Sequence, residues 1–321
     1  MKSYYSQAPG ACLSCTIDKY VYVSLLVHPE TDYSVRTMYE QTETVNDLNE
    51  IKHDIVREAL KIYHIANSHG ITISSMADIP ASGTGLGSSS AFTVGLLNAL
   101  SRIDNDRTGL AEDCNHRYHL AEEACKLEID ICGHPIGKQD QYAAALGGMN
   151  FIKFWNDETV DVSTTSGVQM NTYRLQQNLL LVYTGISRKA DDILTQQNTN
   201  LENDQKSRNA LRRNATRAHW AYQIMQTAGI SLDEIGEMLH EAWQDKKSIV
   251  SSISNPKIDE IYETALKAGA TGGKVIGAGG GGFMIFYCPR RYNRVWNKLT
   301  DSGVKLYPFK FVDHGSRVME V

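Results

Sequence analysis

The stretch that decides the fold reads Pro80-Ala81-Ser82-Gly83-Thr84-Gly85-Leu86-Gly87-Ser88-Ser89-Ser90-Ala91. Three glycines within five residues permit positive φ and a close approach of the backbone, and hydroxyl side chains follow where an apolar helix begins. The free N–H groups of a helix N-terminus, with the positive end of the helix dipole, favour phosphate binding. The serines add donors and a potential ligand for Mg²⁺. The stretch predicts a phosphate-binding loop, with a serine-capped glycine turn as the alternative. It is not a Walker A sequence, because no Lys-Ser or Lys-Thr follows a glycine at the required spacing.

A second glycine-rich stretch, Gly277-Ala278-Gly279-Gly280-Gly281-Gly282, lies near the C-terminus and contains the pattern G-x-G-x-x-G. A dinucleotide-binding fingerprint must open a helix, whereas the apolar run Phe283–Tyr287 that follows here is typical of a strand. We therefore reject a dinucleotide site. The glycines predict backbone that lies close to a ligand or to another strand.

Two carboxylates stand out from the other acidic residues. Glu128 falls beside the apolar stripe of a helix expected over residues 110–131, and a buried carboxylate needs a partner. A metal ion and a salt bridge at the helix end both satisfy that need. Asp140 follows a break at Gly137, a position that suits a general base and equally suits a helix N-cap.

Composition excludes several classes of protein. The 321 residues correspond to about two domains, and 32 basic against 37 acidic residues give a net charge of −5, without the basic excess of a nucleic-acid-binding protein. No apolar run reaches the length of about 18 residues that a membrane span needs, and the N-terminus lacks the apolar region of a secretory signal, which predicts a cytoplasmic protein. Of the six cysteines, Cys12 and Cys15 form a lone C-x-x-C, for which reduced core thiols are the default interpretation.

The pattern of apolar residues predicts an α+β protein of two domains, at residues 1–168 and 169–321, with the polar stretch 157–171 as the boundary region. A strand is expected within residues 11–27, and residues 33–45 are expected to pair with it. Further strands are expected at residues 71–74, 151–155, 179–183, 274–276, 283–287 and 305–312. Helices are expected at residues 49–68, 91–100, 110–131, 189–225, 231–251 and 257–268.

The glycine-serine loop resembles the second motif of the GHMP small-molecule kinases, P-x-x-x-G-L-G-S-S, which Pro80 and residues 85–89 match throughout. Residues 274–282 resemble the third motif of that family. Within the family the chain is most similar to the D-glycero-D-manno-heptose 7-phosphate kinases. The stretches that carry this likeness are Ile17-Asp18-Lys19-Tyr20, residues 133–150, Tyr183-Thr184-Gly185 and Gly315-Ser316-Arg317. The resemblance covers nearly the whole chain.

The resemblance implies two α+β domains with ATP and substrate in the cleft between them. It implies that Ser89 and Glu128 hold Mg²⁺ and that Asp140 orients or deprotonates the attacking hydroxyl. The residues implied to bind ATP and its phosphates are Gly83, Thr84, Gly85, Leu86, Gly87, Ser88, Ser89 and Ser90. Those implied to support the loop or the substrate are Thr184, Gly185, Gly277, Gly279, Gly280 and Gly281. The candidates for a phosphate on the substrate are Arg188, Lys189 and Arg317.

The implied reaction is phosphorylation of the anomeric hydroxyl of D-glycero-D-manno-heptose 7-phosphate to the 1,7-bisphosphate, and the implied partner is this small molecule. A related sugar kinase, such as one for L-fucose, is an alternative because such kinases share these motifs. The family's first motif is expected before Ser3, and the sequence begins at Met1. A catalytically inactive binding protein of the same fold is therefore a second alternative, although Ser89, Glu128 and Asp140 are all retained.

Overall fold

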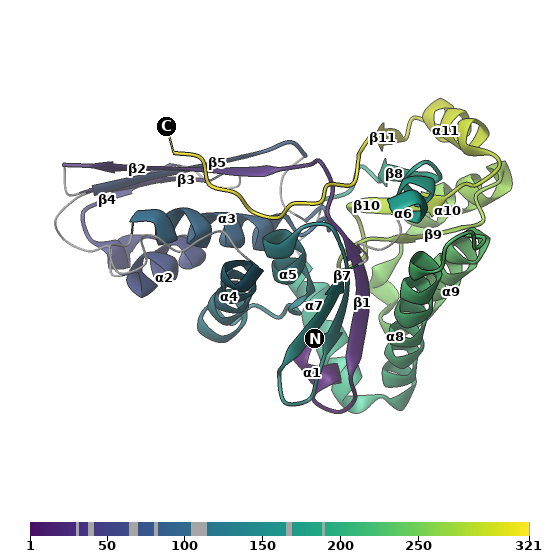
Figure 1. The fold of residues 1–321 in the computed structure, drawn as a ribbon, viewed down its shortest axis with the longest axis horizontal. Helices are drawn as coiled ribbons and strands as arrows, with labels where there is room; N and C mark the ends of the chain where they lie inside the picture. Colours follow the sequence, from purple (N-terminus) through teal and green to yellow (C-terminus); the bar gives the residue numbers. More distant parts are fainter. Residues whose placement is uncertain are drawn as a thin grey trace. The chain divides into compact units, whose positions relative to one another are not determined.

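The computed structural model describes residues 1–29, 32–37, 42–63, 70–79, 83–103, 114–164, 169–187 and 190–320. The chain forms two compact units, drawn in Figure 1. Unit 1 comprises Met1–Asp18, Gly83–Leu86 and Gly148–Val312, and unit 2 comprises Lys19–Ser82, Gly87–Gly147 and Asp313–Val321. The units are interleaved along the chain, so they are a different division from the sequence domains at residues 1–168 and 169–321, which stay a prediction.

Unit 2 is built on one four-stranded sheet with the order β2-β5-β3-β4. Its strands are β2 (Val21–His28), β3 (Tyr33–Arg36), β4 (Glu43–Val45) and β5 (Gly70–Ala77). β5 runs antiparallel to β2 and parallel to β3, and β3 runs antiparallel to β4. Helices α2 (Asp54–Ile62) and α3 (Ser88–Ile103) cover one face of the sheet (Figure 1). α3 buries Val94, Leu97 and Leu100 completely. This packing holds the helix in place and so positions its N-terminus, which contains Ser88, Ser89 and Ser90.

The rest of unit 2 carries the candidate carboxylate Glu128. The 3₁₀ turn Leu48–Glu50 precedes α2, and α4 (Cys114–Cys125) continues directly into a π-helix, η2 (Lys126–Ile131). Gly133, with a φ of 73°, then redirects the chain toward α5 (Gln139–Leu146). A wider π-helical turn shifts the register of side chains relative to an α-helix, and such turns are frequent at functional sites. Glu128 lies in this turn.

Unit 1 contains two antiparallel sheets, with the orders β1-β6-β7 and β11-β8-β10-β9. The strands are β1 (Gly10–Cys15), β6 (Met149–Phe154), β7 (Val160–Thr164), β8 (Leu179–Tyr183), β9 (Gly272–Val275), β10 (Phe283–Tyr287) and β11 (Lys305–Tyr307). The helices are α1 (Lys2–Tyr5), α6 (Gln169–Gln176), α7 (Ala190–Asn203), α8 (Gln205–Gln226), α9 (Asp233–Ile249), η3 (Ser251–Ile253), α10 (Pro256–Ala268) and α11 (Tyr292–Asp301).

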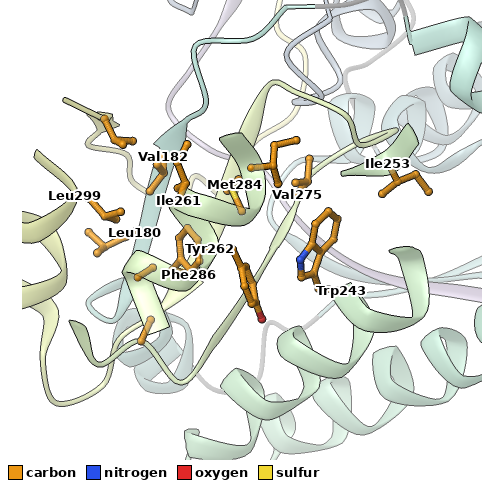
Figure 2. Packing of buried hydrophobic residues seen from close by; sticks show 14 of the residues in the cluster. Leu180, Val182, Trp243, Ile253, Ile261, Tyr262, Val275, Met284, Phe286 and Leu299 are labelled. Carbon is orange, nitrogen blue, oxygen red and sulfur yellow. The ribbon is translucent and has the colours of Figure 1, made fainter. Parts of the chain in front are cut away.

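The larger core of unit 1 lies against the second sheet. Figure 2 shows Val275 and Phe286 of the sheet near Trp243 of α9 and Tyr262 of α10. Trp243 is completely buried, and burying a side chain of this size anchors the helix that carries it. α9 is thereby held against β9, the strand that leads into the second glycine-rich stretch.

The observed strands differ from the expected ones in three respects. Residues 11–27 form two strands in different units, because residues 16–18 pair with the C-terminal segment. Ile17 bridges to Phe311, and the backbone N–H of Asp18 donates to the carbonyl of Lys310 at 2.8 Å. The segment 33–45 pairs with β5 and with itself rather than with β2. The polar boundary region contains an unexpected strand, β7, whose partner is β6.

Several helices are shorter than expected. The helix expected at 49–68 begins at Asp54, and residues 64–69 lie outside the described residues. The helix expected at 110–131 begins at Cys114 among the described residues and becomes a π-helix after Cys125. The pattern did not indicate α6 or α11.

All six cysteines are described, and none forms a disulfide. Burial raises the pKa of the Cys15 thiol to about 12, so its reactive thiolate form is scarce at neutral pH. Cys15 therefore fits the expected role of a reduced core thiol.

Candidate active site

The glycine-serine loop adopts the backbone that its glycines predict. Gly83, Gly85 and Gly87 have φ values of 78°, 80° and 74°, a region that side chains with a Cβ rarely enter. The loop passes from unit 1 to unit 2 between Leu86 and Gly87, so each half is described with its own unit. Residues 80–82 lie outside the described residues.

The first half of the loop is held by the second glycine-rich stretch. A Cβ at Gly85 would lie 2.5 Å from the carbonyl oxygen of Ile276, and a Cβ at Gly277 would lie 2.5 Å from the Cα of Gly85. The backbone N–H of Phe283 donates to the carbonyl of Thr84 at 2.9 Å. The glycines of both stretches thus allow two backbones to touch, and the partner of the second stretch here is the glycine-serine loop, where the sequence had predicted a ligand or another strand.

The second glycine-rich stretch is itself anchored on several sides. The backbone N–H and the hydroxyl of Thr184 donate to the carbonyl of Gly282 at 2.9 and 2.8 Å. The N–H of Gly280 donates to the carbonyl of Ile253, and the Asn255 side chain donates to the carbonyl of Gly280 at 3.1 Å. The structure therefore places Thr184 beside the run, in hydrogen-bond contact with it.

Three further predicted residues, Gly185, Gly279 and Gly281, lie in or next to the same region of unit 1. A Cβ at Gly279 would lie 2.8 Å from the Ile253 side chain, and one at Gly281 would lie 2.7 Å from the carbonyl of Ile186. Gly185 has a φ of 77°, and no atom of the described residues lies within 4 Å of the place of a Cβ, so glycine fits there by its conformation.

The second half of the loop opens α3 in unit 2. The N–H of Ala91 donates to the carbonyl of Gly87 at 2.8 Å and closes the first helical turn. Ser89 is exposed, Ser90 is buried, and the hydroxyl of Ser88 is buried without a hydrogen-bond partner among the described residues. Buried hydroxyls are normally satisfied. The unsatisfied oxygen of Ser88 at a helix N-terminus therefore fits a loop that receives a phosphate.

Glu128 is completely buried and lies beside the serines. Its Oε1 accepts from the Ser89 hydroxyl at 3.2 Å, and its Oε2 accepts from the Gln141 amide at 2.6 Å. Burial raises the pKa of Glu128, although hydrogen bonds from Gln141, Ser90 and Ser89 act in the opposite direction. No described basic side chain forms an ion pair with it. The structure thus gives no support to the salt-bridge reading among the described residues.

Asp140 occupies the second position of α5, so it is not the N-cap, which is Lys138. Its side chain packs against the loop, because a Cβ on Gly87 would lie 3.2 Å from the Cγ of Asp140. The Gln139 amide donates to its Oδ1 at 3.1 Å. In unit 2, Glu128 and Asp140 therefore both contact the stretch Gly87–Ser90, Glu128 through the hydroxyl of Ser89 and Asp140 through packing on Gly87.

The basic residues expected to meet a substrate phosphate are only partly described. Arg188 and Lys189 lie outside the described residues, and Arg317 is exposed. The tail that carries Arg317 is tied to α5, since the N–H of Ser316 donates to the carbonyl of Ala144 at 2.9 Å. Gly147 permits this approach, because a Cβ there would lie 2.0 Å from the backbone carbon of His314. Arg317 thus belongs to the same unit as Asp140.

Two residues at the site escaped the sequence analysis. Gln141 is completely buried against Glu128, and Lys246 of α9 donates to the carbonyl of Gly277. A glutamine in a short helix next to glycines does not by itself indicate a functional residue. A lysine in the last turn of an amphipathic helix does not indicate one either. Only the folded contacts identify them.

The Ser89 and Glu128 oxygens suit Mg²⁺, which prefers hard oxygen ligands and is commonly held by one or two carboxylates with substrate phosphates. A buried carboxylate that lacks a described cation also favours a metal partner. Among the described residues no group of three or more His, Cys, Asp or Glu could hold a metal ion. A cation at Glu128 would accordingly depend on hydroxyl and phosphate oxygens.

Comparison with known proteins shows the family of the chain. The GHMP kinases N terminal domain matches residues 52–148, and the GHMP kinases C terminal domain matches residues 224–305, together more than half of the chain. A D-glycero-alpha-D-manno-heptose 7-phosphate kinase of Campylobacter jejuni is 29% identical over 97% of this chain and 91% of its own length.

Two other similarities are more distant. The bifunctional fucokinase/GDP-fucose pyrophosphorylase of Arabidopsis thaliana is 26% identical over 81% of this chain but only 23% of its own length. The structure of a D-glycero-D-manno-heptose 1-phosphate kinase from Bacteroides thetaiotaomicron has a TM-score of 0.74 at 22% identity, covering 99% of this chain and 93% of that chain. This likeness supports the fold.

The chain belongs to the GHMP kinase family. It is an ATP-dependent kinase, and the predicted two-domain α+β fold of that family is confirmed. The location of the site in an interdomain cleft and the cytoplasmic location stay predictions. None of the described helices has the length and apolar character required to cross a membrane.

Proposed function

We propose that the chain transfers the γ-phosphoryl group of ATP to the anomeric hydroxyl of D-glycero-D-manno-heptose 7-phosphate, giving the 1,7-bisphosphate and ADP. The observation that carries the proposal is the grouping of Ser89, Glu128 and Asp140 around the helix that opens from the glycine loop. The similarity of nearly the whole chain to a heptose 7-phosphate kinase supports the choice of sugar.

The chemistry assigned to each group follows from phosphoryl transfer. Backbone N–H groups of residues 83–89 and the hydroxyls of Ser88 and Ser90 bind the triphosphate, and residues Thr184, Gly185, Gly277 and 279–281 keep the loop in place. Asp140 orients the anomeric hydroxyl and accepts its proton as the sugar oxygen bonds to the γ-phosphorus and the bond to the β-phosphate oxygen breaks. Mg²⁺, held by Ser89 and Glu128, would neutralise charge on the phosphates.

The phosphate of the substrate needs a basic partner of its own. We assign this role to Arg317, whose tail is tied to α5, the helix of Asp140, and to Arg188 and Lys189 by their place after Thr184-Gly185. An arginine is suited to bidentate phosphate binding. L-fucose carries no phosphate, so the same basic residues would have no phosphate to bind in a fucokinase. The partial similarity to a fucokinase keeps that sugar as the second candidate.

The test is a substrate comparison with the purified full-length protein. ADP release is measured with ATP and Mg²⁺ alone, with heptose 7-phosphate and with L-fucose, and the product is identified by ³¹P NMR. We expect strong stimulation by heptose 7-phosphate and a new anomeric phosphate signal. Equal turnover of ATP with and without this sugar would refute the proposal, and preferential stimulation by L-fucose would establish the alternative.

Asp140→Asn separates an enzyme from an inactive binding protein. Removing a general base typically costs about 10²- to 10⁴-fold in kcat, whereas ATP affinity should stay within about threefold, because Asp140 is assigned to the sugar. Asp301→Asn, an exposed carboxylate at the end of α11, is the matched control and should behave as wild type. A wild-type protein that binds ATP without turning over any sugar would favour the binding protein.

A further inference from the structure

We infer that Lys246 is a positioning residue for the nucleotide loop, acting through the second glycine-rich stretch and not through direct contact with the reacting groups. The inference rests on the proposed function, in which residues 83–89 hold the triphosphate. Lys246 belongs to α9, a helix that no motif of the sequence singled out.

The first step concerns how α9 reaches the glycines. Trp243, one turn earlier on α9, is completely buried and packs beside Val275, the last residue of β9. The helix end therefore lies over the point where the chain leaves the sheet. Lys246 donates from Nζ to the carbonyl of Gly277 and, at 3.5 Å, to that of Val275.

The second step concerns how the glycines reach the loop. Ile276 and Phe283 close the base of the stretch, since the N–H of Ile276 donates to the carbonyl of Phe283 at 2.9 Å. Gly277, whose carbonyl Lys246 binds, touches Gly85 so closely that neither position has room for a Cβ. A single residue thus separates the ammonium group from the backbone of the phosphate loop.

The third step explains why a charged donor is suited to this position. Gly277 and Gly279 have φ values of 67° and 102°, and a glycine run has many alternative conformations of similar energy. A hydrogen bond from a charged group is stronger than a neutral one. Lys246 selects one conformation of the run, and Thr184 and Asn255 hold its far side. Because Gly277 packs directly against Gly85, the conformation of Gly277 restricts the conformation of Gly85.

The neighbouring lysine provides a matched control. Lys247 lies on the same helical turn but points to a different environment, with its ammonium 5.6 Å from the Trp243 ring centre and 4.0 Å from a carboxylate oxygen of Asp259. Lys246→Met and Lys247→Met remove the same charge from the same helix end, so they share the loss of a favourable dipole interaction. Only the first removes the contact with Gly277.

The experiment measures ATP and ADP binding by calorimetry with Mg²⁺ present, using wild type, Lys246→Met, Lys246→Arg and Lys247→Met as full chains. We expect Lys246→Met to weaken nucleotide binding about tenfold, to raise KM for ATP in parallel and to leave KM for the sugar within about twofold. Lys246→Arg keeps a charged donor and should recover most of the affinity. Lys247→Met should match wild type.

Amide hydrogen exchange of the nucleotide-free proteins gives an independent measurement. Residues 277–283 should exchange faster in Lys246→Met than in Lys247→Met. Unchanged exchange together with wild-type affinity in Lys246→Met would overturn the inference, as would equal losses in both methionine variants. A wild-type protein that binds neither ATP nor ADP would instead contradict the proposed function, so the two failures are distinguishable.

Discussion

At the scale of single residues, Glu128 is a completely buried carboxyl group that forms no ion pair with a described side chain, and burial raises its pKa. Burying an ionised carboxylate costs free energy. The hydrogen bonds from Ser89 and Gln141 reduce that free-energy cost but do not cancel it, because neither donor carries a charge. A group in such a place gains a great deal from a bound cation and costs stability without one. The buried position of Glu128 is therefore better explained by a role in function than by a contribution to the stability of the fold.

Glu128→Gln should stabilise the protein in the absence of nucleotide and Mg²⁺. The folded-state pKa of Glu128 is raised by burial, so the folded protein holds the proton more tightly than the unfolded chain does. The wild type then loses stability as pH rises above the ordinary pKa of 4.5 and through the raised one. Glutamine keeps a similar shape and has no charge to bury.

Thermal unfolding from pH 4.5 to pH 8 measures this difference. The Tm of Glu128→Gln should exceed that of the wild type by an amount that grows with pH and then levels off. Mg²⁺ with ATP should raise the wild-type Tm much more than that of the variant, and kcat/KM of the variant should fall about 10²-fold or more. A variant less stable than the wild type at pH 8 would show that the charge serves the fold.

At the scale of elements, the packing of α8 on α9 depends on one buried carboxylate. Asp245 of α9 accepts from Nε of Arg213 at 3.0 Å and from Nη1 of Arg217 at 2.6 Å. Burial pushes the pKa of Asp245 upward, but hydrogen bonds from both arginines and their charges outweigh it, so the pKa is lowered. Glu241 forms a second bond to Arg217 but is largely exposed.

Asp245→Asn should destabilise the protein by about 2 kcal/mol at pH 7, because it removes the ion pairs of a largely buried carboxylate, while Arg217 keeps its bond to Glu241 and the half-exposed Arg213 is solvated by water. A lowered folded-state pKa means that this stabilisation is complete above the ordinary value of 3.8 and is lost as pH falls through the lowered value. Denaturant unfolding should therefore show a constant deficit from pH 7 to about pH 4 that shrinks below it.

The matched control is Glu241→Gln, which removes the exposed partner of the same arginine and should cost less than about 1 kcal/mol. A similar deficit for both variants would mean that burial of Asp245 adds nothing to the ion pair.

The strands show which elements could be predicted from the sequence and which could not. Leu179–Tyr183 was predicted with its observed bounds, because a short apolar run between polar stretches is visible locally. β7 was missed because residues such as Asp161 and Ser163 have little strand propensity, and its pairing with β6 supplies what the sequence lacks. The split of residues 11–27 depends on Phe311 and Lys310, far away in the chain.

The same distinction holds for the candidate site. The glycines of the glycine-serine loop were predictable, because a positive φ favours glycine over other residue types. The sequence predicted that residues 277–282 approach a ligand or another strand, and the structure places Gly277 against Gly85 of the glycine-serine loop instead. Gln141 and Lys246 could not be foreseen, since any residue of suitable length has the same local pattern until the fold brings it to its partner.

At the scale of the whole molecule, the chain carries a net charge of −5, the wrong sign for attracting ATP through a long-range field. The loop offers short-range interactions instead: backbone N–H groups, hydroxyls and a carboxylate suited to Mg²⁺. Salt screens exposed charges over a distance of about 10 Å at 0.1 M ionic strength but acts weakly on groups in direct contact. The two modes of binding therefore respond differently to ionic strength.

We expect KM for ATP to change by less than about threefold between 50 and 300 mM KCl, with free Mg²⁺ held constant, since contact hydrogen bonds are little screened. Initial rates at saturating sugar give this value. The kcat at saturating ATP, measured in the same salts, is the control that reveals any effect of salt on the fold or on chemistry. A tenfold or larger rise in KM with an unchanged kcat would show that a basic surface, and not the loop, supplies most of the nucleotide affinity.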